Sequence, residues 1–316
     1  WRGRAAEALG NSVAMRAGYQ AAARYPTAYY GQLALARLGR DGVELHAPSP
    51  AANADSMAAD ERVRAADMLY TIGEPDIVLY FAADLAEESP DVGMLEALGE
   101  LTGRRNDARA MLQIGKIALA RGFAFDHYAF PVIGIPRHSP IAPDIGRSMT
   151  YSIARTESAF DQRDKSAANA VGLMQVTPEA GRDTAKRFGV SYDWSRMVSD
   201  PVYNTQMGAA ELSALLAEYR GCHIMTFAGY NAGRGRVRDW IKAYGDPRDP
   251  KVDPVDWVER IPISETRNYV QRVMENFVVY RARFEDAGTA IAAKSGERVV
   301  TQETNAAPAG AAIPSQ

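Results

Sequence analysis

Glu157 is the residue of this chain whose surroundings most favour acid–base chemistry. It follows a largely apolar stretch that runs through Ile145, Met149 and Ile153. A helix over this stretch would end at Glu157, where the helix dipole disfavours an anion. Phe160 follows three residues later, within reach of the same helix face. We therefore predict a carboxyl group whose pKa is raised toward neutrality, so that it can hold a proton and deliver it.

Further segments carry residue types that suit a polar binding site. They read GLMQVTP at 172–178, FAGYNAG at 227–233 and IPISETR at 261–267. Glycine permits close backbone approach, and methionine, glutamine, tyrosine and asparagine offer apolar walls, amides and a hydroxyl group. The glycines around 229–235 lack the Gly-x-x-x-x-Gly-Lys-Ser/Thr order and the strand context of a phosphate-binding loop, so we exclude that interpretation.

These segments, together with ARTESAF at 154–160, resemble the catalytic domain of the soluble lytic transglycosylases. That family cleaves the glycan strands of bacterial cell walls and is related in fold to goose-type lysozyme. The resemblance is specific over residues 145–280 and only general over 1–130. It implies that Glu157 protonates the oxygen between N-acetylmuramic acid and N-acetylglucosamine. Glu157 would then remove the proton from the C6 hydroxyl, which attacks C1 and closes a 1,6-anhydro ring.

The resemblance also implies which residues bind the substrate. Ser166 would contact the peptide or acetamido portion, and Asn231 would orient the N-acetyl group. The complete implied set of substrate-binding residues is Ser166, Gly172, Met174, Gln175, Tyr230, Asn231, Glu265 and Tyr269. The family usually has proline where Arg234 stands here, a departure that bears on the rigidity of the loop.

Some of these residues also have a purely structural interpretation. Met174 alone is typical of core packing. Ser264 as an N-cap and Glu265 in the first turn would together begin a helix without any further role. Only the resemblance favours the interpretation as binding residues, and both interpretations stay open at the level of the sequence.

No second carboxylate stands out beside Glu157, although ordinary glycoside hydrolysis uses two. Asp161 and Asp164 lie in a polar stretch that we expect to form a solvated loop, and Glu179 follows Thr177-Pro178 at a helix start. The absence of a second carboxylate fits the resemblance to this family. In the family, one glutamate acts first as acid and then as base, while the substrate's N-acetyl group stabilises the charge at C1. The absence favours a transglycosylase over the alternatives, a goose-type lysozyme-like hydrolase and a non-catalytic peptidoglycan-binding scaffold.

The organisation that would position these residues is all-α. We predict a helical superhelix, a tetratricopeptide-like α-solenoid, over 1–130, because Ala- and Leu-rich helix pairs alternate with turns there. Four prolines between 131 and 143 exclude a helix and mark the boundary to a lysozyme-like α-rich catalytic domain over 131–284. Residues 285–316 lack aromatic residues, and we expect this tail to be disordered.

Particular helices can be placed from their patterns. Thr27 is a candidate N-cap for a helix that ends near Gly39, and Asp144 for the helix that ends near Glu157. A buried stripe is expected to consist of Ile77, Tyr80, Phe81 and Leu85. Another helix starts near Asn106, ends near Gly122 and should bury Ala108, Met111, Leu112, Gly115 and Leu119. Pro48 and Pro50 mark a loop.

Bulk composition restricts the partners. The chain has 316 residues, of which 47% are hydrophobic and 24% charged, and a net charge of −3, which gives no reason to expect nucleic acid. No run of about 18 apolar residues predicts a membrane span. Cys222 is the only cysteine and the four histidines are scattered, so we predict no disulfide, metal or cofactor. The N-terminus lacks an apolar signal core, so we expect a processed or truncated periplasmic chain whose partner is the peptidoglycan glycan strand.

Overall fold

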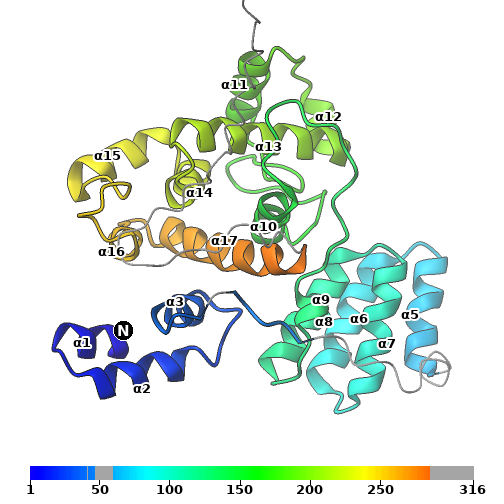
Figure 1. Ribbon diagram of the computed structural model, residues 1–316. Helices are drawn as coiled ribbons and strands as arrows, with labels where there is room; N and C mark the ends of the chain where they lie inside the picture. The colour runs from blue at the N-terminus through cyan, green and yellow to red at the C-terminus, as the bar shows by residue number, and fades with distance from the viewer. Residues whose placement is uncertain (41, 47–59, 285–316) are drawn as a thin grey trace, which may run out of the picture.

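The computed structural model describes residues 1–40, 42–46 and 60–284, and within them the chain is all-α, as predicted (Figure 1). The expected tail at 285–316 and the loop at Pro48 and Pro50 lie outside the described residues. The helices are α1 (Arg2–Ala8), α2 (Ser12–Ala22), α3 (Tyr29–Arg37), α5 (Glu61–Thr71), α6 (Pro75–Glu88), α7 (Val92–Arg104), α8 (Ala108–Ala120), α9 (Asp126–Ala129), α10 (Arg147–Glu157), α11 (Pro178–Phe188), α12 (Trp194–Ser199), α13 (Pro201–Glu218), α14 (His223–Ala232), α15 (Arg234–Tyr244), α16 (Pro254–Glu259) and α17 (Ser264–Arg283).

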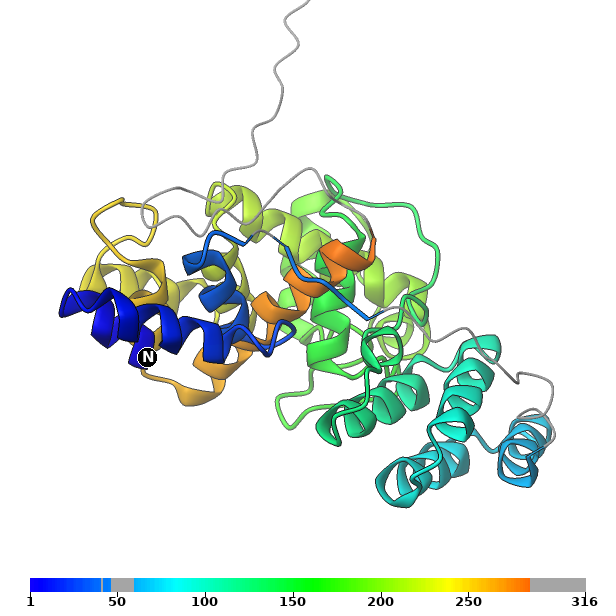
Figure 2. The ribbon, with the colours of Figure 1, turned by 60° about the horizontal axis from the view of Figure 1, so that its bottom comes forward.

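The helices before residue 130 form two groups that lie apart (Figures 1 and 2). Helices α1–α3 lie beside α16 and α17, where Arg4 Nη2 lies 2.9 Å from Asp253 Oδ2 and the Tyr29 amide donates to Glu275 Oε2 over 2.9 Å. Helices α5–α9, which we call the helical module, lie at the other end of α17 and have a core of their own around Leu95, Leu98 and Ile114. The described part of 1–130 therefore consists of helices and the turns between them, but these helices form two separate groups and not one uninterrupted superhelix.

The larger core surrounds α10 and α17 and extends into the helical module. Residues 131–146 contain no helix, as the prolines predicted, yet the larger core has members on both sides of this connection. Ala108, Leu112 and Phe130 belong to the same buried cluster as the residues that follow them. The Phe130 ring meets the Tyr280 ring edge-on, with 5.9 Å between their centroids. Apolar packing thus joins α8 and α9 to α17.

A partly buried arginine, Arg155, fixes the C-terminal end of α10. Arg155 Nε donates to the Ala129 carbonyl over 3.0 Å, and Nη1 donates to Asn276 Oδ1 over 2.7 Å. Asn276 in turn donates from Nδ2 to Thr156 Oγ1 over 2.9 Å. Because a buried guanidinium is costly unless its donors find acceptors, these bonds hold α9, α10 and α17 in one arrangement.

The predicted helix caps differ from the observed ones. Helix α3 has Ala28 rather than Thr27 at its N-cap, and α17 begins with Ser264 after an Ile263 N-cap. Helix α10 starts at Arg147, because the carboxylate of Asp144 accepts the Gly146 amide and forms a local turn before the helix. Short polar side chains make such turns as readily as caps, and sequence alone does not separate the two.

The stripe predicted on α6 is half right, because Phe81 and Leu85 are partly buried against the module's core, whereas the prediction for α8 is largely confirmed. Ile77 and Tyr80 are 48% and 68% exposed, and the fully buried residues of α6 are Val78, Ala82 and Ala86. These smaller side chains suit close packing of helix on helix. Helix α8 begins after an Asp107 N-cap and buries Ala108, Met111, Leu112 and Gly115, whereas Leu119 is only partly buried.

Gly115 lies where α8 and α9 approach most closely. A Cβ atom there would meet the Ala129 amide nitrogen at 2.1 Å, so Gly115→Ala must push the backbones apart. We expect a loss of about 1–3 kcal/mol in the free energy of unfolding, measured by urea denaturation. Gly103→Ala on α7 is the matched control, because no atom lies within 4 Å of its Cβ and it should gain about 0.5–1 kcal/mol. Equal stability of the two variants would contradict the packing argument.

Candidate active site

Glu157 is the last residue of α10, and its carboxyl group faces α17. The Tyr269 hydroxyl donates to Glu157 Oε1 over 2.6 Å. Burial raises the pKa of Glu157 to about 7, the Tyr269 hydrogen bond opposes this rise, and the negative charges of Glu265 and Asp164 add to it. The raised pKa predicted from the sequence thus has desolvation as its main cause. A carboxyl group of this kind exchanges a proton near neutral pH.

Two tyrosines beside Glu157 remain protonated donors. Tyr269, on α17, is 8% exposed, and burial together with the Glu157 charge raises its pKa well above the usual value. Tyr230, on α14, has its pKa raised by the same causes and donates to the Met174 carbonyl over 2.7 Å. The two phenols therefore keep their hydroxyl protons at any pH at which Glu157 titrates.

The segment that follows Glu157, residues 158–176, returns to α10 and is called the site loop. It begins with Ala159 and Phe160 at φ of 50° and 67°, values that non-glycine residues adopt rarely. Isolated bridges join Lys165 to Val171 and Val171 to Val176. The Gly172 amide donates to the Asp164 carbonyl over 3.0 Å. The loop is thus closed on itself by its own backbone.

Gly172 and Met174 have structural positions. Gly172 has a φ of 77°, and a Cβ there would lie 2.3 Å from Asn204 Nδ2. Met174 is 0% exposed and packs against Gly208, while its amide donates to Asn204 Oδ1 over 2.9 Å. The core-packing interpretation accounts for the Met174 side chain, because a fully buried side chain presents no wall to a ligand.

Gln175 and Ser166 lie on the outer part of the site loop. Gln175 Nε2 donates to the carbonyls of Asp164 and Gly172, each over 3.1 Å. Ser166 is exposed, and its hydroxyl oxygen accepts the Ala170 amide over 3.0 Å. Both side chains support the loop's own conformation in this structure.

Asn231 and Glu265 lie where α14 ends and α17 begins. The Thr266 hydroxyl donates to Asn231 Oδ1 over 2.7 Å, which ties the two helix ends together. Glu265 is exposed in the first turn of α17, and its charge contributes to the raised pKa of Glu157. Of the residues expected at the site, Tyr269 is linked to Glu157 by a hydrogen bond, and Tyr230 and Glu265 are linked to it electrostatically. Ser166 has no such link to Glu157 among the described contacts.

Sequence reasoning missed Asn204 and the influence of Asp164. Asn204 is fully buried on α13 and also donates from Nδ2 to the carbonyls of Val171 and Met197, over 2.8 and 3.1 Å. Asn204 lies beside Thr205 and Gln206 in the polar start of α13, so the local sequence gives no signal that it is buried. Asp164 is exposed, as expected of a solvated loop, yet its charge acts on Glu157.

Within residues 1–40, 42–46 and 60–284, no cluster of at least three His, Cys, Asp or Glu side chains has an arrangement suited to a metal ion. Over the same residues, no helix has both the length and the apolar character needed to cross a bilayer.

Comparison with known proteins confirms the resemblance seen in the sequence. Residues 142–252 match the family model described as "Transglycosylase SLT domain". A curated relative, the soluble lytic murein transglycosylase of Escherichia coli strain K12, is 36% identical over 151 residues, which is 48% of this chain and 23% of that protein. The chain thus spans much less than half of this relative's length.

Solved structures share the fold over nearly all of the chain. The 70 kDa soluble lytic transglycosylase of Escherichia coli has a TM-score of 0.73 at 24% identity, over 90% of this chain and 45% of that one. The inactive mutant of the lytic transglycosylase Slt from Pseudomonas aeruginosa has a TM-score of 0.64 at 26% identity, over 96% of this chain and 47% of that one. The all-α arrangement is therefore that of known lytic transglycosylases.

The raised pKa of Glu157 makes stability depend on pH. An unfolded carboxyl ionises near 4.5, whereas the folded one keeps its proton up to about 7, so the folded state loses stability as pH rises through this window. Glu157→Gln cannot ionise and should be more stable than the wild type above pH 7, by up to about 3 kcal/mol. This is an upper bound because solvent reaches part of the side chain. Denaturation at pH 4 and pH 8 measures it, and an advantage that is equal at both pH values would refute it.

Removing the Tyr269 hydroxyl should raise the pKa of Glu157 above about 7. The hydroxyl donates to the carboxylate and so favours the ionised form, and phenylalanine lacks this donor. Carbon-detected NMR titration of the Glu157 carboxyl in Tyr269→Phe measures the change. Tyr230→Phe is the control, because its hydroxyl donates to the Met174 carbonyl instead and the hydrogen bond to Glu157 stays intact. An unchanged or lowered pKa of Glu157 in Tyr269→Phe would show that the hydrogen bond does not stabilise the ionised carboxylate.

Proposed function

We propose that this chain cleaves the glycan strands of peptidoglycan as a lytic transglycosylase, at the bond from N-acetylmuramic acid to N-acetylglucosamine. The observation that carries this proposal is the partly buried Glu157, with its pKa raised to about 7 and its Tyr269 hydrogen bond, within a region that matches the SLT family. The substrate is the one named for the murein transglycosylase relatives. Because that substrate lies outside the inner membrane in such bacteria, we also propose a periplasmic location.

In the first step, protonated Glu157 donates to the glycosidic oxygen, and the bond from that oxygen to C1 breaks. Burial supports this role because it keeps the proton on the carboxyl group near neutral pH. After transfer, the new carboxylate is stabilised by the Tyr269 hydroxyl. The substrate's own N-acetyl group compensates the positive charge at C1, which needs no second protein carboxylate.

In the second step, the Glu157 carboxylate removes the proton from the C6 hydroxyl, whose oxygen bonds to C1. The product carries a 1,6-anhydro ring, no water is consumed, and Glu157 recovers its proton. Asp164 and Glu265 are the other carboxylates that act electrostatically on Glu157, and both favour its protonated form. We propose that their charges help Glu157 to keep the recovered proton and that neither carboxylate attacks the sugar.

The substrate-binding residues remain part of the proposal. Gln175, Tyr230, Asn231, Glu265 and Tyr269 come from three segments around Glu157 and offer amides, hydroxyls and a carboxylate to sugar hydroxyl and acetamido groups. Ser166 and Gly172 shape the site loop, and the backbone of Met174 holds Tyr230, so we propose that these three act by positioning.

The product distinguishes a transglycosylase from the lysozyme-like hydrolase. Mass spectrometry of soluble fragments from purified peptidoglycan should find muropeptides lighter by one water than hydrolysis products and without a reducing end. Glu157→Gln, which keeps the size and the Tyr269 contact, should lose turnover by at least about a hundredfold because the proton donor is gone.

Other results of the same digestion would favour one of the two alternative functions, the hydrolase or the scaffold. Reducing muropeptides would mean a hydrolase that admits water to C1. Binding of peptidoglycan without any fragment release by the intact chain would favour the non-catalytic scaffold.

A further inference from the structure

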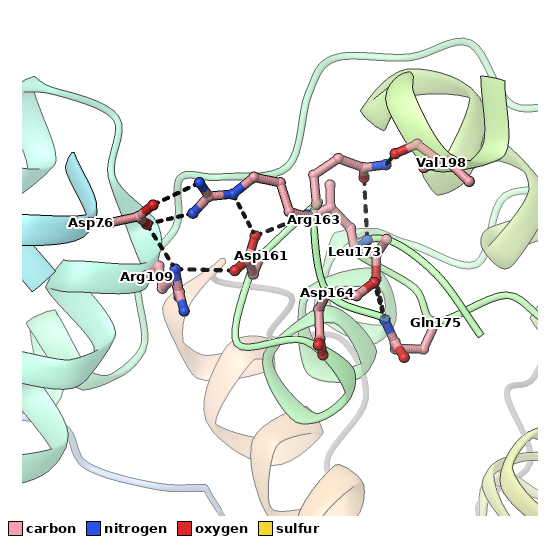
Figure 3. A network of polar contacts seen from close by, with 10 residues as sticks. Asp76, Arg109, Asp161, Arg163, Asp164, Leu173, Gln175 and Val198 are labelled. Carbon is pink, nitrogen blue, oxygen red and sulfur yellow. Dashed lines mark hydrogen bonds and ion pairs between the residues drawn. The ribbon is translucent and has the colours of Figure 1, made fainter. Parts of the chain in front are cut away.

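A closed ring of charged side chains joins the helical module to the site loop (Figure 3). Arg163 forms two hydrogen bonds to the carboxylate of Asp76, on α6, one of them 2.8 Å from Nη1 to Oδ2. Arg109, on α8, lies 3.1 Å from Asp161 Oδ2 and 3.3 Å from Asp76 Oδ1. Arg163 Nε completes the ring at 3.4 Å from Asp161 Oδ1. Two arginines and two aspartates thus alternate, and their charges cancel.

The ring holds the loop at its first turn. Asp161 follows directly on Phe160, and Arg163 comes two residues later. Phe160 has a left-handed conformation, which is unfavourable for a side chain with a Cβ. Such a conformation persists only where the surroundings enforce it. A Cβ on Gly134 would lie 2.5 Å from the Ala108 Cβ and 3.5 Å from Phe160, so Gly134 of the proline-rich connection lies close to both the start of α8 and the site loop.

The held turn leads directly to the residues of the site. Asp164 is the next residue after Arg163, and its charge acts on Glu157. The Asp164 carbonyl accepts the Gly172 amide and the Gln175 side chain, which Figure 3 shows reaching back toward it. A displacement of residues 161–163 would therefore move Asp164. It would change both the hydrogen bond of Gln175 and the electrostatic effect of Asp164 on Glu157.

We propose that Asp76 and Arg109 of the helical module are positioning residues for the active site, acting through Asp161 and Arg163 on the site loop. The bidentate contact of Arg163 with Asp76 fixes direction as well as distance. The module would then be needed for substrate binding even though it lies outside the region that matches the SLT family. This inference rests on the proposed function, because its first readout is turnover of peptidoglycan.

The test compares Asp76→Asn and Arg163→Gln with a matched control in digestion of purified peptidoglycan. Each variant should raise KM about tenfold with a smaller change in kcat, since the loop is misplaced while Glu157 and Tyr269 stay in position. The double variant should be no worse than either single one, because both remove the same contact. The control is Asp67→Asn, which removes the Arg105 ion pair inside the module at an exposure like that of Asp76, 49% against 48%.

The pH profile supplies a readout that a general loss of stability would not move. Tyr269, Tyr230, Glu265 and Asp164 are the titratable groups that act on or contact Glu157. If the loop is released, the negative charge of Asp164 moves away, and the alkaline limb of kcat/KM should shift to lower pH. The limb should keep its position in Asp67→Asn.

Hydrogen exchange tests the positioning without any turnover. In Asp76→Asn and Arg163→Gln, the amides of Gly172 and Gln175 should exchange faster, while those of α13 and α14 keep their rates. If the wild type does not cleave peptidoglycan but the two variants still show this faster exchange, the proposed function is refuted and the positioning of the loop by the ring stays intact. Wild-type KM and exchange in both ring variants, or equal losses in Asp67→Asn, would overturn the inference.

Discussion

The hydrogen bond from Tyr269 to Glu157 joins the end of α10 to the second turn of α17, and it depends on both helix ends being held in register. A carboxyl group has to leave water to keep its proton, yet it has to stay open to a substrate. The chain meets both demands by ending a buried helix at the site. Arg155 and Asn276 then fix that end against α9 and α17, so the position of the acid follows from the packing of the whole core.

The electrostatics of the site come from the end of α10, the site loop that follows it and the start of α17. Desolvation raises the pKa of Glu157, and Asp164 in the site loop and Glu265 on α17 act in the same direction, while Tyr269 opposes them. Since the opposing hydrogen bond strengthens as the carboxylate forms, the site accommodates both protonation states. A single carboxyl group that acts first as acid and then as base requires interactions that stabilise both its protonated and its ionised form. It does not require a second carboxylate that acts as a nucleophile.

The sequence predicted the elements better than the contacts between them. The apolar run before Glu157, the prolines after Phe130 and the pattern of α8 are local signals, and the structure has the expected helix end, connection and helix there. The contact of Met174 with Asn204 could not be predicted from the local sequence, because the two residues are 30 positions apart in the chain. The same holds for Arg163 and Asp76, which are 87 residues apart in the chain.

The continuous core around Phe130 bears on how such a chain can be rearranged in evolution or in protein engineering. A gene fusion that begins at residue 131 would discard Ala108, Leu112 and Phe130 from the larger core, and would leave the face of Tyr280 that the Phe130 ring covers open to water. The transplantable unit therefore includes α8. Since α8 also supplies Ile114 to the core around Leu95 and Leu98, a crossover ahead of Asp107 would split the helical module. A crossover ahead of α5 keeps the buried residues of both cores together.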